Sequence, residues 1–299
     1  MIEVKNLSKS FNDSKVLSDL NLLVEKGSIY GLIGANGAGK TTLIKHITGV
    51  FKQDAGEVLI NNEPVLDNEK IKSRIGYIAD DLYFLNGYSL KAMAKYYAQI
   101  YPHWNQERYT KMLTLFNLDE KKNLSKFSKG MRKQASFILA MSIMPIALIL
   151  DEPIDGLDPL VRKKVWKLIV EDVADREMSV LVSSHNLKEM EGICDSIGIL
   201  NEGHMILQRN LDELKSDICK IQIAFDGEEP SDLQEKLNIL HKEKRGSVNQ
   251  MIVKGNVTDI AKLLQSYHPL LLDVLPLSLE EIFIYELGGE GYEIQGIIF

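Results

Sequence analysis

The chain has 299 residues, of which 45% are hydrophobic and 26% are charged, and its formal net charge is −7. This length and composition are typical of a globular protein with a sizeable core and two domains. The negative charge excludes a global basic field that would attract nucleic acid, so we expect no nucleic-acid partner. Two cysteines, Cys194 and Cys219, provide neither metal-ligand spacing nor a disulfide framework, which suits a reducing cytoplasm.

From the sequence we expect neither a secretion signal nor a membrane span. The N-terminal stretch MIEVKNLSKSF lacks the apolar core of a signal peptide. The longest apolar stretch, residues 137–150, contains Ser142 and Pro145 and is too short to cross a bilayer. We therefore expect a cytoplasmic protein that does not enter the membrane by itself.

The first predicted elements surround a glycine-rich loop. Residues 2–4 and 20–24 alternate like strands, and residues 28–34 form a short apolar run typical of a buried strand. The sequence GANGAGKT, residues 34–41, fits the pattern Gly, any four residues, Gly, Lys, and Ser or Thr. A helix is expected over residues 40–49. The order strand, loop and helix is the setting that a phosphate-binding loop requires.

This loop is expected to wrap the phosphates of a nucleotide. Its glycines allow successive backbone N–H groups to point at the β-phosphate, and the positive N-terminus of the next helix faces the same anion. Lys40 would bind the β and γ oxygens, and the Thr41 hydroxyl would reach Mg²⁺. The expected nucleotide contacts in this loop are Gly34, Ala35, Asn36, Gly37, Ala38, Gly39, Lys40, Thr41 and Thr42.

Strands and helices alternate through the middle of the chain. The strands expected here are residues 57–60, 74–78, 146–150 and 178–185. A helical pattern covers residues 89–117, where Asn105 is suited to cap a helix, and another helix begins at Pro159 and ends near Ala174. A turn is expected at residues 201–203. This alternation predicts an α/β fold with a mostly parallel sheet covered on both faces.

The composition changes near Leu211, which suggests a second domain. The order expected there is strand 220–225, helix 231–237, strand 239–243, strand 248–254, helix 258–267 and strand 271–275. That order is the split βαβ, ferredoxin-like pattern, although a loosely organised extension is the alternative. We therefore expect one domain over residues 1–210, with a helical subdomain at about 82–140, and an accessory α+β domain over residues 211–299.

Two carboxylates end the apolar strand 146–150. Asp151 and Glu152 follow it directly. An enzyme with a phosphate loop needs an acid at a strand end to hold Mg²⁺, and an adjacent Glu can act as general base toward the attacking water. Two surface acids after a core strand are common by themselves. With a phosphate loop upstream, we assign Asp151 to the metal and Glu152 to catalysis.

With these motifs in place, residues 2–209 resemble the ATP-binding subunits of ABC transporters. The sequence FSKGM at 127–131 stands where the family signature LSGGQ belongs, and IDGLD at 154–158 matches the D-loop. His185, just after LVSS, matches the switch histidine. The resemblance implies a P-loop NTPase cassette with a RecA-like core, an antiparallel β subdomain and a helical subdomain, and it implies ATP and Mg²⁺ as cofactors.

The resemblance also implies a composite site in which two cassettes face head to tail around ATP. One cassette contributes the loop, the two acids and His185, which should bind the γ-phosphate and the attacking water beside Glu152. The other contributes Ser128 and Gly130 at the start of a helix whose N-terminus binds the γ-phosphate. Phe11 falls where the family places an aromatic ring on adenine, and packing in the small antiparallel sheet is an equal alternative.

Two motifs depart from the family pattern. Asp80 occupies the place of a Gln, and we predict that it is still a metal-side ligand, at a cost in ATP affinity when Mg²⁺ is scarce. A solvated acid pair with Asp81 is the alternative. Lys129 and Met131 replace Gly and Gln in the signature. Lys129 can add an attractive charge across the dimer or point to solvent.

The resemblance predicts the ATPase subunit of a transporter, peripheral on the inner face of the cell membrane. Its partners would be a transmembrane permease and a second cassette, identical or related. Tyr83, Phe84 and Tyr88 are the best docking candidates, because they lie in the loop before the first helix of this segment, whereas most of its other rings are expected to form its own core. Overall likeness and the C-terminal LSLEEIFIYEL suggest the export of peptides or drugs.

A soluble ABC-type ATPase that acts on ribosomes or DNA is the alternative function. The single phosphate loop, the absence of sustained heptads and the net charge of −7 count against it. The sequence does not decide whether the C-terminal domain senses a ligand or braces a dimer.

Overall fold

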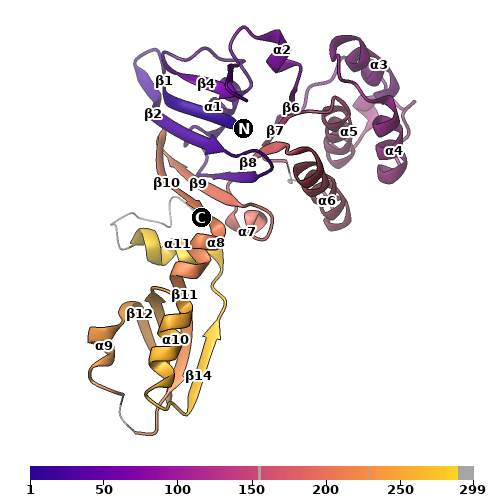
Figure 1. Cartoon of the computed structure of the whole chain (residues 1–299). Coiled ribbons are helices and arrows are strands. Elements are labelled where there is room, and N and C mark those ends of the chain that lie inside the picture. The colour runs from indigo at the N-terminus through magenta and orange to yellow at the C-terminus, as the bar shows by residue number, and fades with distance from the viewer. Residues whose placement is uncertain (154–155, 228, 289–299) are drawn as a thin grey trace. The chain divides into compact units, whose positions relative to one another are not determined.

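In the computed structural model, residues 1–153, 156–227 and 229–288 are described (Figure 1). The chain divides into two compact units. The first contains residues 1–185 and 196–208, and the second contains residues 186–195 and the chain from Arg209 onward. The domain boundaries expected from the sequence, 1–210 and 211–299, remain a prediction.

The first unit is built around a six-stranded sheet with the order β10-β9-β3-β8-β7-β6. Its strands are β3 (Ile29–Ile33), β6 (Ile75–Ile78), β7 (Ala147–Asp151), β8 (Ser179–Ser184), β9 (Ser196–Asn201) and β10 (His204–Asn210). The pairs β3·β8, β3·β9, β6·β7 and β7·β8 are parallel, as the alternation predicted. The residues of β3, β7 and β8 are all buried, which is typical of strands covered on both faces. The carboxyl ends of these strands meet at one edge, where ligands bind in such sheets.

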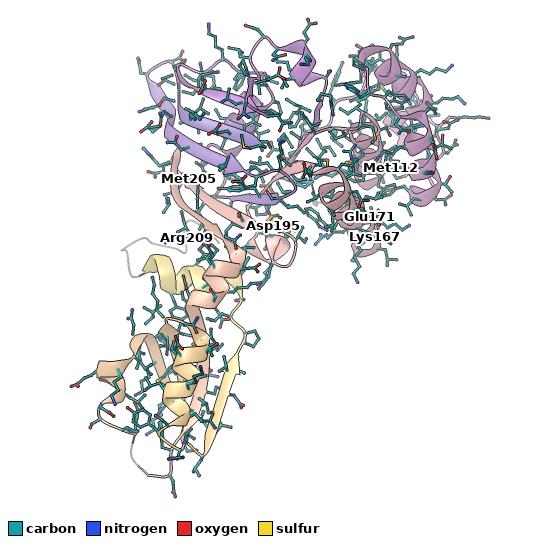
Figure 2. The ribbon with its side chains drawn as sticks, viewed as in Figure 1. Met112, Lys167, Glu171, Asp195, Met205 and Arg209 are labelled. Atoms are coloured by element: carbon teal, nitrogen blue, oxygen red, sulfur yellow. The ribbon has the colours of Figure 1, made fainter. Side chains whose placement is uncertain are left out.

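Two helices begin where the sequence predicted, α4 after the N-cap Asn105 and α6 at Pro159. The helices of the first unit are α1 (Lys40–Ile47), α2 (Glu69–Lys72), α3 (Leu90–Ile100), α4 (Gln106–Phe116), α5 (Lys129–Ser142) and α6 (Pro159–Arg176). The single pattern expected over 89–117 is two helices, and Asn105 Oδ1 caps the second by accepting from the Arg108 N–H at 2.9 Å. Figure 2 shows Lys167 and Glu171 on α6, with charged atoms 3.9 Å apart. No described helix is long and apolar enough to cross a bilayer.

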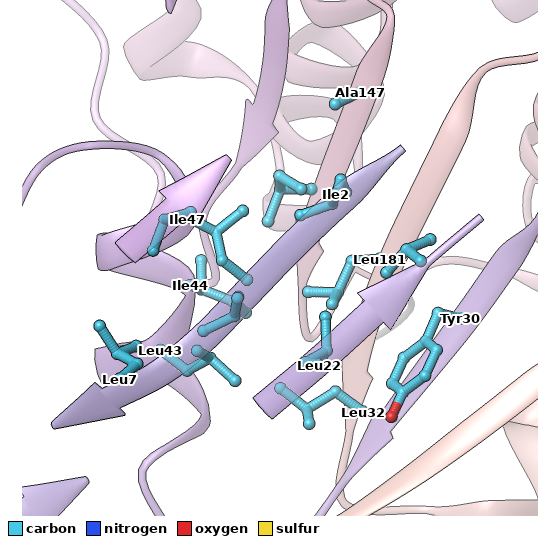
Figure 3. Close-up of a cluster of buried hydrophobic side chains, with 14 of the residues drawn as sticks. Ile2, Leu7, Leu22, Tyr30, Leu32, Leu43, Ile44, Ile47, Ala147 and Leu181 are labelled. Carbon is cyan, nitrogen blue, oxygen red and sulfur yellow. The ribbon is translucent and has the colours of Figure 1, made fainter. Parts of the chain in front are cut away.

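A second sheet, β2-β1-β4-β5, is antiparallel. Its strands are β1 (Ile2–Phe11), β2 (Ser14–Val24), β4 (Ala55–Ile60) and β5 (Glu63–Pro64). Strands β1 and β2 are longer than expected, because bulges near Asn6 and Asp19 interrupt the alternation that marks a strand. A buried cluster joins this sheet to α1 and β3, and its members include Ile2, Ile44 and Leu32 (Figure 3). Because α1 packs on the antiparallel sheet and on β3 in one cluster, the first residues of α1 are held next to the end of β3.

The second unit contains an antiparallel sheet with the order β12-β13-β11-β14. Its strands are β11 (Ile218–Ala224), β12 (Asn238–Arg245), β13 (Val248–Lys254) and β14 (Leu271–Leu275). Helix α9 (Leu233–Lys236) lies between β11 and β12 in the chain, and α10 (Val257–Gln265) lies between β13 and β14. This is the predicted split βαβ pattern rather than a loose extension. Helix α9 is shorter than expected, because the Asp232 side chain makes no cap hydrogen bond.

Three more helices complete the second unit. They are α7 (Leu187–Met190), α8 (Leu211–Asp217) and α11 (Leu279–Gly288). Side chains of α9 and α10 pack with Ile221 on one face of the sheet. Its neighbour Lys220 points to the other face, where its Nζ lies 2.8 Å from Glu281 of α11. Both cysteines, Cys194 and Cys219, are buried in this unit.

Candidate nucleotide-binding site

The phosphate loop connects β3 to α1, and close packing explains its glycines. A Cβ at Gly34 would lie 2.3 Å from the Leu200 carbonyl oxygen. Gly39 has φ +108°, and a Cβ there would lie 2.9 Å from a Leu17 methyl group. The loop can therefore take this path only with glycine at both positions. Lys40 lies over the loop, with Nζ donating to the Gly34 carbonyl oxygen at 2.6 Å.

A cavity of about 220 Å³ opens above this loop. Its lining residues are Val16, Ala35, Asn36, Gly37, Gly39, Lys40, Thr41, Thr42, Asp80 and Glu152. The first turn of α1 contains no acidic residue, so the positive end of the helix is not neutralised locally. The structure thus brings most of the predicted loop residues to one space that suits an anion. Gly34 and Ala38 lie behind this surface and are both buried.

Asp151 is 2% exposed at the end of β7. Its Oδ2 accepts from the Thr41 hydroxyl at 3.0 Å, and its Oδ1 accepts from the Ser183 hydroxyl at 2.6 Å. Two of the three residues predicted to bind Mg²⁺, Thr41 and Asp151, are therefore neighbours. Sequence reasoning missed Ser183, whose only signal was a polar residue near the end of an apolar strand.

The donor set fits Mg²⁺. A hydroxyl and a carboxylate are hard oxygen ligands, and Mg²⁺ in nucleotide sites takes one or two protein ligands plus phosphates and water. Among the described residues, no group of three or more His, Cys, Asp or Glu side chains could hold a metal by itself. A magnesium ion at Thr41 and Asp151 would thus depend on oxygens from the nucleotide.

Glu152 is bonded through both its backbone and its side chain. Its φ is +47°, a left-handed conformation that is rare for a residue with a side chain. Its N–H donates to Ser183 Oγ at 3.1 Å, and its carbonyl oxygen accepts from Lys133 Nζ at 2.7 Å. Its carboxylate lies 2.9 Å from His185 Nδ1 and 3.6 Å from Lys40 Nζ. The predicted base and switch histidine are therefore in direct contact.

Asp80 follows β6 and lines the same cavity. Its side chain is 56% exposed, and its Oδ1 lies 3.8 Å from Lys133 Nζ. The neighbouring Asp81 is exposed. This placement leaves both alternatives open, so the metal-ligand role of Asp80 remains a prediction.

The signature residues begin α5. The Ser128 hydroxyl caps this helix by accepting from the Met131 N–H at 3.2 Å. A Cβ at Gly130 would lie 2.9 Å from the Gly156 carbonyl oxygen, so glycine is needed where the two segments touch. Lys129 is exposed and packs its methylene groups near Gly156. In the predicted D-loop, Ile154 and Asp155 lie outside the described residues.

Phe11 ends β1 and is 40% exposed. Its ring meets Phe51 edge to face at 5.5 Å between centroids, and Lys9 Nζ lies 5.4 Å from its centroid. The ring therefore packs at the small sheet while part of it stays open. Its contact with adenine remains a prediction.

Comparison with known proteins establishes the family. The family described as ABC transporter matches residues 17–155. The ABC transporter ATP-binding protein YtrB of Bacillus subtilis (strain 168) is 33% identical over 97% of this chain and 99% of its own length. The chain belongs to the ABC transporter ATP-binding proteins. Another such protein, the bacitracin transport ATP-binding protein BcrA of Bacillus licheniformis, is 29% identical over 97% of this chain and 98% of its own length.

The solved structures agree with this assignment. An ATP-binding subunit of an ABC transporter is 31% identical, with a TM-score of 0.68, over 72% of this chain and 92% of that one. A bacterial ABC cassette solved as a dimer is 20% identical and shares the fold, with a TM-score of 0.65. The predicted cassette fold is confirmed, and this ABC transporter subunit is an ATPase, as predicted.

Proposed function

We propose that this ABC ATPase closes Mg²⁺-ATP between its own phosphate loop and the signature of a second cassette. We further propose that the resulting cycle drives separate membrane subunits that export peptides or drugs. The observation that carries the proposal is the contact of Lys40, Glu152 and His185 at one wall of the phosphate-loop cavity.

In the proposed mechanism, the loop amides and Lys40 hold the phosphates in place for hydrolysis. Glu152 accepts a proton from the attacking water as general base. The contact from Nδ1 of His185 orients the Glu152 carboxylate, and Nε2 of the same ring can then reach the water or the γ-phosphate. Ser183 and Thr41 fix the Asp151 carboxylate from two sides.

Mg²⁺ would be held by Thr41 and Asp151, and when bound it offsets negative charge on the phosphates. Asp80 lies on the same cavity and is a candidate for a further, metal-side ligand. Replacing it in an Asp80→Ala variant should raise the Mg²⁺ concentration required for half-maximal ATPase activity. An unchanged Mg²⁺ dependence would remove Asp80 from the metal site.

The proposed second cassette follows from where the signature lies. Ser128 and Gly130 do not line the phosphate-loop cavity of their own chain. Helix α5, which they begin, has no acid in its first turn, so its N-terminus suits a phosphate supplied by another subunit. All the expected catalytic positions are filled in this chain, so a homodimer would be competent.

Mixing two inactive variants tests the composite site. Lys40→Ala should disable the loop side, and Ser128→Ala should disable the signature side. A mixed dimer then contains one site with both defects and one intact site, so ATPase activity should return when the two variants are combined. Two variants that stay inactive together, although each still dimerises, would contradict a shared site.

The proposed membrane partner would dock on the loop before α3. There Tyr83 is 79% exposed and Tyr88 is 36% exposed. Phe84 is partly covered, because the Arg132 guanidinium lies 5.6 Å from its ring centroid. Two relatives named as bacitracin transport ATP-binding proteins support the transport of a peptide antibiotic. A permease partner would hold the subunit at the inner face of the cell membrane.

The docking proposal is tested by changing Tyr83 and Tyr88 to Ala. The double variant should keep its basal ATPase activity and lose co-purification with the membrane protein. Resistance to a peptide antibiotic should fall as well. Tyr96→Ala is the matched control, because this ring on α3 is 41% exposed. Equal loss in the control would assign the effect to the helical segment in general.

A further inference from the structure

Helix α5 contains a buried lysine next to the proposed general base. Lys133 is 3% exposed, and its Nζ donates to the Glu152 carbonyl oxygen at 2.7 Å. The same nitrogen lies 3.8 Å from Asp80 Oδ1. Burying an ammonium group costs several kcal/mol unless polar partners compensate it. The Glu152 carbonyl oxygen and the Asp80 carboxylate are such partners, and they stabilise the ammonium group of Lys133 in its buried position.

The carbonyl that Lys133 holds belongs to a strained residue. A left-handed backbone at a residue other than glycine costs about 1–3 kcal/mol and persists only where its surroundings enforce it. At Glu152, Ser183 accepts from the N–H group and Lys133 donates to the C=O group. Side chains from β8 and α5 therefore fix the backbone of Glu152 from both ends of the residue.

The backbone conformation decides where the Glu152 carboxylate points. In the observed conformation it reaches His185 and Lys40. A rotation of the Glu152 backbone would carry the carboxylate away from both. Among the described residues, Lys133 contacts the main chain of Glu152 and the side chain of Asp80, so its effect should fall on the direction of the base rather than on the binding of ATP.

Helix α5 also holds the loop after β6. Arg132 donates from its guanidinium to the Leu82 carbonyl oxygen at 2.7 Å, and Lys133 contacts Asp80 in the same loop. Arg132 thus holds this loop on α5, and its neighbour Lys133 connects the loop to Glu152.

We propose that Lys133 is a positioning residue for ATP hydrolysis, which locks Glu152 in its left-handed conformation and links it to Asp80. This inference rests on the proposed role of Glu152 as general base. It assigns to Asp80 a second partner besides the metal, and it explains why an acid is tolerated where the family pattern has Gln: the acid faces a buried ammonium group.

The test compares Lys133→Met with Lys133→Gln in the full-length protein. Met removes the donor and keeps the length, so kcat should fall about 10- to 100-fold, the scale expected when a reacting group is misplaced by about 1 Å. The KM for ATP and the Kd of a fluorescent ATP analogue should stay within about threefold of the parent. Gln keeps a donor for the carbonyl oxygen and should restore most of kcat.

Asp80→Asn adds a coupling test. At saturating Mg²⁺ it should lower kcat modestly by itself, and in the Lys133→Gln background it should not lower kcat further, because the charge it faces is already absent. Lys72→Met is the matched control, since Lys72 Nζ donates to the Gly49 carbonyl oxygen at 2.9 Å, away from Glu152. Circular dichroism spectra confirm that each variant is folded.

Glu152→Gln is measured in parallel. Loss of activity in Glu152→Gln together with a selective fall of kcat in Lys133→Met supports the inference. If Glu152→Gln is inactive but Lys133→Met keeps the kcat of the parent, the proposed role of Lys133 is wrong, and the role of Glu152 as general base is retained. The same conclusion follows if the Met and Gln variants at position 133 have the same kcat. An active Glu152→Gln variant would contradict both the role of Glu152 as general base and the role of Lys133 in positioning it.

Discussion

The two units of the molecule differ in what they bury. Among the described residues, the second unit buries one polar side chain, Asn249. The first unit buries Lys40, His46, Lys133, Gln134, Ser142, Asp151, Asp172, Ser179, Ser183 and Ser184. Buried polar groups are costly unless they are paired, so their concentration marks where a protein accepts that cost for another purpose. In the first unit, several of these side chains surround the proposed ATP site.

The second unit contains an ion pair at its surface instead. Lys236 lies 2.7 Å from Asp232, and both side chains are more than two-fifths exposed. Exposed ion pairs of this kind contribute little to stability, because water and salt screen them. The comparison predicts that changes in the first unit alter turnover or folding strongly, whereas matched changes in the second unit do not.

The largest effect is expected at Glu152. Glu152→Gln should lower kcat about 10²- to 10⁴-fold while ATP still binds, because a general base contributes a factor of that size. Glu229→Gln is the matched change in the second unit, where Glu229 accepts from Lys242 and Asn249. Steady-state ATPase assays should find its kcat within about twofold of the parent. A large loss at Glu229 would break the comparison by giving the second unit a part in hydrolysis.

The next effect concerns stability and Asp172. This side chain is 5% exposed and lies 2.6 Å from the Arg108 guanidinium and 3.3 Å from that of Arg176. Asp172→Ala should lower the free energy of unfolding by about 2–3 kcal/mol, because it leaves two partly buried cations without this carboxylate. Urea denaturation followed by circular dichroism measures it.

Two controls sharpen this result. Glu171→Ala changes the preceding residue of α6, whose exposed pair with Lys167 has a 3.9 Å separation. Asp232→Ala breaks the pair with Lys236 in the second unit. Glu171→Ala should cost about 1 kcal/mol or less, and Asp232→Ala should lower the stability far less than Asp172→Ala does. If these variants lose as much unfolding free energy as Asp172→Ala, burial of polar groups does not explain the difference between the two units.

A smaller effect should appear as a pH dependence at His46. Its ring is 2% exposed, and burial lowers its pKa from the usual value near 6.5. The unfolded chain therefore binds a proton more readily than the folded one. Stability from this group is complete above about pH 6.5 and declines as the pH falls toward the lower, folded-state pKa. Melting temperatures between pH 5 and 7.5 should fall less steeply on acidification in His46→Phe than in the parent. Parallel curves would contradict this cause.

The smallest effect is expected at Lys129. Its side chain is exposed, and a single exposed charge opposite a phosphate contributes little. Lys129→Ala should weaken ATP-driven dimerisation by a few-fold if the charge reaches the second site. Sedimentation of the ATP-bound Glu152→Gln background at low and high salt measures it, since only a charge effect fades with salt. No difference at either salt concentration would place Lys129 toward solvent.

The sequence predicted those parts of the site that local patterns define. An apolar strand that ends in two carboxylates is visible without a structure, so Asp151 and Glu152 could be assigned directly. Lys133 and Ser183 could not, because their importance depends on the left-handed backbone of Glu152 and on elements far away in the chain. The same limit applies to β1 and β2, where irregular pairing hides the alternation.

The tryptophans and the cysteines lie in different units, so each residue type can report on the unfolding of one unit. Both tryptophans, Trp104 and Trp166, belong to the first unit, and both cysteines belong to the second. Burial raises the pKa of the Cys219 thiol to about 11 and raises that of Cys194 as well. A thiol reagent therefore reports the opening of the second unit, while intrinsic fluorescence reports that of the first. The order in which the units unfold can be measured without adding a label.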